Sequence, residues 1–119
     1  MHSDGLSLLR RQLRDLKFEF FEMLGSPQRS VFDQLADAFA FPEYYGGNWD
    51  AFNDCIGDIE PPPRSALLWH GADLHASADP KRFGEACSML TRVFDVWSTE
   101  GSQALLILVG SNDTFDRPN

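Results

Sequence analysis

Asp50 and Asp54 are the residues whose type and spacing point most directly to chemistry. Four positions apart on a helix, their Cβ atoms would lie roughly 6 Å from each other on one face. Two carboxylates placed in this way suit either acid–base catalysis, which needs a closed pocket, or the binding of a cationic group. A third interpretation is a solvated acidic face without a partner, since a negative charge in the first turn also suits the helix dipole.

The residues just before this pair favour recognition over catalysis. Tyr44 and Tyr45 precede a Gly46-Gly47 turn, where the backbone can approach a partner closely. Asn48 is placed to cap the helix that follows. Aromatic side chains beside charged ones are typical of the anchors in protein–protein interfaces. The segment contains no recognisable nucleophile, general base or metal cage, so we expect a binding surface.

A helix that starts after Asn48 would have two distinct faces. Trp49, Phe52 and Ile56 recur at intervals of three and four residues, which is the spacing of an apolar stripe packed against the rest of a domain. The opposite face would meet solvent or a partner, and it would carry Asp50, Asn53, Asp54 and Gly57.

The elements that must carry this helix follow from hydrophobic periodicity and from the positions of Gly and Pro. Apolar runs predict strands over residues 16–24, 65–70 and 104–109. Helices are expected over residues 31–41, 48–57 and 80–99. The order strand, helix, helix, strand, helix, strand predicts a small, three-layer-like α/β domain. Its three-stranded, mostly parallel sheet would be packed by helices.

The remaining parts of the chain carry weaker signals. Residues 1–15 contain leucines at helical spacing, which fits either a short helix packed on the edge or a flexible lead-in. Residues 71–79 are polar and predict a loop. The run ALLILV, residues 104–109, is typical of a strand that is paired on both edges. We therefore divide the chain into an N-terminal extension (1–16), one domain (17–110) and a C-terminal tail (111–119).

Composition limits the classes of partner and compartment. The 119 residues carry a net charge of -8, so nucleic acid and anionic membranes would be repelled, whereas a basic protein or a small cation would be attracted. The same charge can also serve solubility alone. Cys55 and Cys87 are too few for a disulfide scaffold, and we find no signal peptide or bilayer-spanning run. We expect a soluble, cytoplasmic protein.

Metal and cofactor chemistry is not indicated. His2, His70 and His75 share no metal-ligand spacing, and no phosphate-binding glycine loop occurs. Cys55 lies beside the buried face of its predicted helix without a nearby base, as expected of an inert thiol. We expect no metal, no cofactor and no enzymatic activity.

The run PEYYGGNWDAFNDCI closely resembles the barstar family, the small intracellular inhibitors of barnase-type secreted ribonucleases. The resemblance covers about Lys17 to Val109 and implies the same α/β fold together with a ribonuclease-binding surface. It also implies that Asp54 enters the nuclease active site in the place of a substrate phosphate. The residues that match the family's contacts are Tyr44, Gly46, Asn48, Asp50 and Asp54.

Departures from the family pattern concern the identity of the nuclease and not the fold. Asn53 stands where the family has a tryptophan, and Val96 stands where it has an acidic residue. The next acidic position on the long helix is kept as Glu100. One residue is missing after Ile56, which shifts the exit of the helix around residues 57–60.

We therefore expect an immunity-type inhibitor of a basic, barnase-like, secreted or toxin-type ribonuclease, which blocks the active site with an acidic helix and loop patch. The expected contact residues are Tyr44, Gly46, Asn48, Asp50, Asn53, Asp54, Gly57 and Glu100. Nucleic acid, membrane and small-molecule cofactors are not expected as partners. Two other interpretations remain: a module of the same fold that binds another kind of protein, and a small hydrolase that uses the two aspartates as an acid–base pair.

Overall fold

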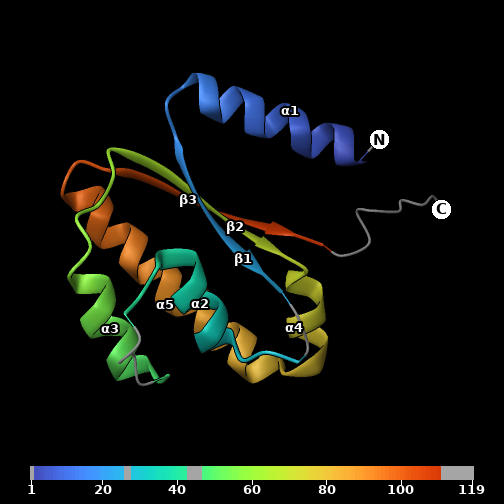
Figure 1. Cartoon of the computed structure of the whole chain (residues 1–119), viewed down its shortest axis with the longest axis vertical. Helices are drawn as coiled ribbons and strands as arrows, with labels where there is room; N and C mark the ends of the chain where they lie inside the picture. The colour runs from blue at the N-terminus through green and yellow to red at the C-terminus, as the bar shows by residue number, and fades with distance from the viewer. Residues whose placement is uncertain (1, 26–27, 43–46, 111–119) are drawn as a thin grey trace.

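Three parallel strands form the sheet around which the chain is arranged (Figure 1). The computed structural model describes residues 2–25, 28–42 and 47–110. The strands lie in the order β1-β2-β3, and their bounds are β1 (Glu19–Leu24), β2 (Arg64–His70) and β3 (Gln103–Val109). Ser65 of β2 is paired with Glu19 on one side and with Ala104 on the other. The predicted α/β class with a three-stranded sheet is confirmed, and the sheet is entirely parallel.

The central strand is β2, whereas the apolar runs favoured β3. β2 is buried from Ser65 to Trp69, because it is paired on both edges and covered on both faces. Within the described ranges β3 pairs only with β2, and Leu105 and Leu108 are 41% and 48% exposed. The expectation that ALLILV is paired on both edges is therefore wrong. An edge strand can be as apolar as a central one when helices cover parts of its faces.

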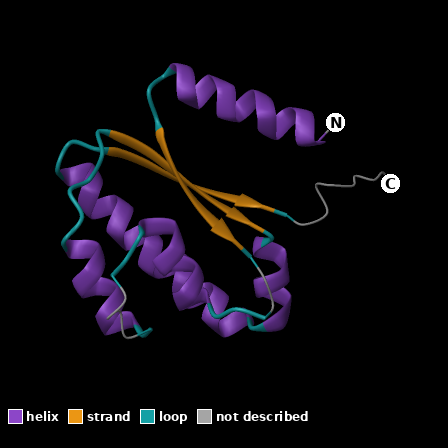
Figure 2. Ribbon diagram, viewed as in Figure 1, coloured by secondary structure: helices purple, strands orange, loops and turns teal. Residues whose placement is uncertain are grey.

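Helices cover both faces of the sheet, which gives three layers (Figures 1 and 2). One face carries α2 (Val31–Phe39), α3 (Trp49–Gly57), α4 (Ala72–Ala78) and α5 (Pro80–Thr99). α1 (His2–Asp15) lies on the other face, where Leu13 is buried together with Ala66 and Leu68 of β2. Of the two interpretations of residues 1–15, the structure supports a helix, and this helix packs over a face of the sheet.

The prediction of a loop over residues 71–79 is wrong, because α4 forms there. Gly71 precedes α4 with a φ of 70° and offers no side-chain cap, so the usual start signal of a helix is missing. His75 of α4 is buried instead of lying in a polar loop, and its Nε2 lies 2.8 Å from Nε2 of Gln34. Burial lowers the pKa of His75 and so favours the neutral ring. Contacts with residues distant in sequence stabilise this short helix.

Most of the hydrophobic core lies between the sheet and the four helices α2 to α5. Its fully buried side chains include Phe52, Leu67, Trp69 and Leu90. None of the helices that the structure describes combines the length and the apolar content needed to cross a bilayer. The division into extension, domain and tail stays a prediction, and residues 111–119 lie outside the described ranges.

A charged cluster joins α1 to the sheet. Arg10 of α1 donates two hydrogen bonds to Glu22 of β1, from Nη1 to Oε2 at 2.9 Å and from Nη2 to Oε1 at 2.6 Å. Nε2 of His70 lies 2.8 Å from the same Oε1. The hydrogen bonds from Arg10 lower the pKa of Glu22 to about 2. Because the Glu22 side chain is 39% exposed, solvent screens part of this stabilisation.

Replacing Glu22 with Gln should lower the free energy of unfolding at neutral pH by about 0.5–1 kcal/mol, since a partly screened ion pair is lost. The lowered pKa of Glu22 determines how this contribution to the free energy of unfolding varies with pH. The carboxylate stabilises the fold fully above its unfolded pKa of roughly 4.3, and this contribution is lost as the pH falls towards the folded pKa of about 2. The difference between wild type and Glu22→Gln in urea denaturation should therefore narrow over that pH window.

Glu19→Gln is the matched control for this measurement. Glu19 is exposed on the same strand and takes part in none of the ion pairs among the described residues. This control should change the free energy of unfolding little at any pH. A difference between wild type and Glu22→Gln that stays constant with pH would contradict the assigned role of the cluster.

Candidate functional site

α3 begins at the predicted cap, which is confirmed. Asn48 has an extended backbone with a φ of -143°, and its Oδ1 accepts a hydrogen bond of 2.8 Å from the backbone N–H of Ala51. Gly47 directly before it has a φ of 71°, a left-handed conformation that glycine adopts without strain. Asp50 lies in the first turn, near the positive end of the helix dipole. The turn and the cap set where α3 starts.

One face of α3 is anchored in the core, as the apolar stripe predicted. Phe52 is fully buried, and Ile56 is buried as well. Trp49 is half-buried: its ring packs edge-on against Phe32 with centroids 4.7 Å apart, and its Nε1 donates to Oε1 of Glu85 on α5 at 3.1 Å. These contacts with α2 and α5 oppose any rotation of α3 about its own axis.

The other face of α3 carries the predicted polar residues into solvent. The exposed residues on this face are Asp50, Asn53, Asp54 and Gly57. None of the ion pairs found among the described residues involves Asp50 or Asp54. Both carboxylates are therefore accessible on a face of α3 whose orientation is held by the buried side chains.

Part of the predicted surface lies outside the described residues. Tyr44, Tyr45 and Gly46 belong to this part, so the roles expected of Tyr44 and Gly46 stay predictions. Asn48 is exposed in addition to capping α3. Glu100 is exposed at the C-terminal end of α5.

A cavity between α3 and α5 brings three of the predicted contact residues together. It has a volume of about 230 Å³, and Asn53, Gly57 and Glu100 are among its lining residues. Its apolar lining comes from Ile56, Ile59, Pro61, Val93, Val96 and Trp97. A second cavity, of about 460 Å³, lies between the same two helices and is lined by Trp49, Asn53, Met89 and others. Arg92 lines both cavities.

The sequence analysis did not point to Ser88 and Arg92 of α5, which line these cavities together with the predicted Glu100. Ser88, Arg92, Val96 and Glu100 follow one another at intervals of four, which places them along one face of α5. This row is the signal that could have found them. Its position opposite α3 becomes clear only from the packing of the two helices.

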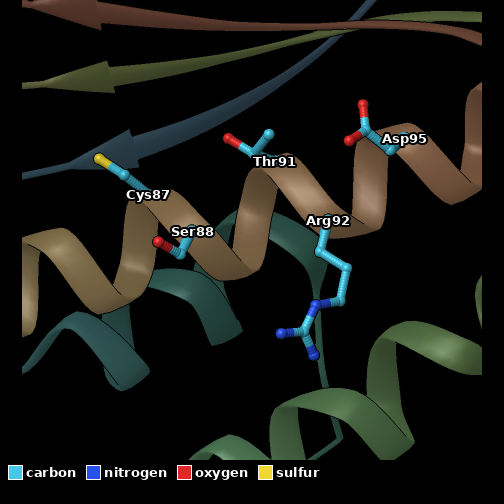
Figure 3. Close-up of a pocket in the computed structure, with 5 residues that line it drawn as sticks. All are labelled: Cys87, Ser88, Thr91, Arg92 and Asp95. Carbon is cyan, nitrogen blue, oxygen red and sulfur yellow. The ribbon is translucent and has the colours of Figure 1, made fainter.

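A further cavity, of about 410 Å³, runs over the surface of α5 itself. Figure 3 shows that Arg92, one of its lining residues, extends from α5 towards α3. The lining residues that point to the opposite side of α5 are Cys87, Thr91 and Asp95. The Arg92 side chain therefore places a positive charge on the side of α5 that faces α3.

The arrangement of these residues gives little support to catalysis or metal binding. Asp50 and Asp54 lie on an exposed helix face, and neither of them lines the two cavities between α3 and α5. Burial raises the pKa of the Cys87 thiol and so favours its weakly nucleophilic neutral form. Across residues 2–25, 28–42 and 47–110, no three His, Cys, Asp or Glu side chains are grouped to hold a metal. The geometry is that of a surface able to bind cations.

Replacing Asn48 with Ala should lower the free energy of unfolding by about 1 kcal/mol, because the N–H of Ala51 loses its cap. Urea denaturation measures the change. Asn53→Ala is the control, since Asn53 is exposed on the same helix and does not cap it. If Asn48→Ala destabilises the fold no more than Asn53→Ala does, the cap does not hold α3.

Comparison with family models relates these features to known proteins. A model described as Barstar (barnase inhibitor) matches residues 26–109, a stretch that contains α2 to α5 together with β2 and β3. The match spans more than half of the chain. A search of curated proteins finds no match. The protein thus belongs to the barstar family.

Proposed function

We propose that the chain inhibits a barnase-type ribonuclease by placing the exposed face of α3 in its active site. The observation that carries the proposal is the pair Asp50 and Asp54. Both are exposed, lie four residues apart on α3, and form no ion pair with a described residue. Membership of a family described as barnase inhibitors supports the same conclusion. The chain acts by binding alone and needs neither a cofactor nor a catalytic group.

The carboxylates of α3 can replace the phosphate of a substrate. A ribonuclease gathers cationic side chains around the phosphate where it cuts, and a carboxylate accepts charge-assisted hydrogen bonds from the same arginine, lysine and histidine groups. We assign this position to Asp54, with Asp50 beside it. A carboxylate offers no phosphodiester bond to cleave, so the complex would persist without turnover.

The anchoring of α3 favours tight binding. Asn48 caps the helix, and Phe52 and Ile56 bury its other face, so few degrees of freedom remain to be lost when a partner docks. Tyr44, Gly46 and Asn48 are proposed to lie on the same contact surface, next to the carboxylates. The recognition surface would then combine a rigid helix with the loop before it.

Further exposed carboxylates extend the negative surface around α3. They are Asp58, Glu60 and Glu100, in a chain of net charge -8. Such a field attracts a basic cleft and raises the rate of association, and added salt weakens the effect. Glu100 is proposed to lie at the rim, where a charge influences association more than dissociation.

Asp54→Ala should weaken the binding of barnase by at least about 2–5 kcal/mol, the general cost of truncating one partner of a buried, hydrogen-bonded charge pair; the barnase–barstar complex is itself a worked example of such coupled pairs. The loss arises because cations of the nuclease are buried without their partner. Glu100→Ala should cost less than about 1 kcal/mol, since an exposed rim pair is screened by water. Titration calorimetry with barnase measures both, and the loss of RNA cleavage is a second readout.

Asp15→Ala is the matched control for charge. Asp15 is exposed at the end of α1, which packs on the opposite face of the sheet from α3. Its removal subtracts one negative charge without touching the proposed surface, so the Kd should stay close to that of the wild type. Equal small losses for Asp54→Ala and Glu100→Ala would contradict the assignment. Binding to a basic protein other than a ribonuclease, with no ribonuclease bound, would favour the other class of partner.

A further inference from the structure

We propose that the nuclease inserts one apolar side chain into the cavity between α3 and α5. This α3–α5 pocket is defined by Asn53, Ile56, Gly57, Val93, Val96 and Trp97. The inference rests on the proposed function, since the pocket opens beside the carboxylates that would meet the nuclease. It adds a requirement that charge alone does not impose. The partner must combine a cationic cleft with an aromatic or long aliphatic side chain at a neighbouring position.

The floor of the α3–α5 pocket is apolar. Trp97 and Ile56 are 4% and 6% exposed, and Val93 packs against the same core. The pocket has a volume of about 230 Å³. An apolar cavity of about 150 Å³ is sufficient for a group of the size of benzene. The pocket can therefore take one large apolar side chain without rearrangement of the core.

The mouth of the pocket lies on the same side of α3 as the acidic residues. Asn53 and Gly57 line the pocket and are exposed, and Asp54 directly follows Asn53. Gly57 leaves the mouth open, since a Cβ at this position would meet no neighbouring atom within 4 Å. On the α5 side, Val96 is 50% exposed. A protein that covers Asp54 would therefore cover this mouth as well.

The two charged residues that border the pocket have opposite signs, and only the carboxylate of Glu100 is complementary to a basic partner. Glu100 and Arg92 both line it, and neither takes part in an ion pair among the described residues. Glu100 can pair with a cation that flanks the inserted side chain, and Arg92 can donate to a carbonyl or carboxylate oxygen. The pocket therefore has polar groups at its border and an apolar interior, as interface hot spots commonly have.

An empty pocket would be unfavourable once a partner covered it. Protein interfaces pack about as densely as protein interiors, and atoms that line a void lose their contacts on one side. The other candidate occupant is a cationic side chain. A substitution at Val96 distinguishes the two occupants. A carboxylate introduced at this position would attract a cationic side chain and would disfavour an apolar one.

Two substitutions test the occupant, with barnase as the probe and calorimetry as the measurement. Gly57→Leu fills the mouth and should raise the Kd by about tenfold or more, as expected when one anchor is excluded. Val96→Glu should raise the Kd to a similar extent. Gly5→Leu is the matched control, because Gly5 is an exposed helical glycine on α1 whose Cβ would also meet nothing within 4 Å.

Two results with barnase would overturn the proposal. One is an unchanged Kd for Gly57→Leu relative to Gly5→Leu. The other is tighter binding by Val96→Glu, which would show that the occupant is a cation. Failure of the wild type to bind barnase would count against the proposed function. The proposal of an apolar pocket would then be tested by a measurement that uses no nuclease.

A titration with indole tests the pocket in the absence of any nuclease. Saturable NMR shifts are expected for the backbone amides of Gly57 and Val96 and for the indole N–H of Trp97. Gly57→Leu should abolish these shifts, and Gly5→Leu should preserve them. A wild-type protein whose pocket signals do not respond to indole would overturn the proposal.

Discussion

The packing of Phe52 and Trp49 decides which side chains of α3 reach the surface. Phe52 is fully buried, and Trp49 is held between Phe32 of α2 and Glu85 of α5. Successive residues of an α-helix are separated by about 100°, so a rotation by one residue would carry Asp54 away from its outward position. The negative surface proposed for recognition therefore depends on apolar contacts on the opposite side of the same helix.

The carboxylates of the chain are used in two different ways. Glu22 is paired with Arg10, Asp37 with Arg29 and Glu85 with Arg82. In contrast, none of the ion pairs among the described residues includes Asp50 or Asp54. Two like charges one turn apart destabilise a helix by a few tenths of a kcal/mol, and the cap at Asn48, which contributes about 1 kcal/mol, offsets this. The stability of α3 is thus compatible with two neighbouring carboxylates that pair with no described residue, as the proposed function requires.

Local patterns predicted the elements that have clear start signals and a regular apolar stripe. α3 with its cap at Asn48 is of this kind, and so is α5 with Pro80 in its first turn. α4 could not be predicted locally, because Gly71 provides no cap and the buried contact of His75 is with Gln34 of α2. The order of the strands in the sheet could not be predicted locally either. β2 and β3 are both continuous apolar runs, and only the assembled sheet shows that β2 is central.

In the candidate site, too, some features follow from a local pattern and others depend on the packing of distant segments. The helical period was enough to place the two aspartates on one face, whereas the pocket beside them arises where α5 packs against α3. Arg92 and Val96 belong to a row on α5 whose relation to α3 depends on that packing. A periodic row shows that residues share a face, but the element opposite that face is set by contacts between segments distant in sequence.

Competition for the active site tests the central claim most directly. A short DNA oligonucleotide binds a ribonuclease through its phosphates but lacks the 2′-hydroxyl that cleavage requires. If α3 occupies the phosphate site of barnase, the apparent Kd of the chain for barnase should rise in proportion to the oligonucleotide concentration, and no ternary complex should form. An apparent Kd that is independent of the oligonucleotide, together with a stable ternary complex, would contradict the account.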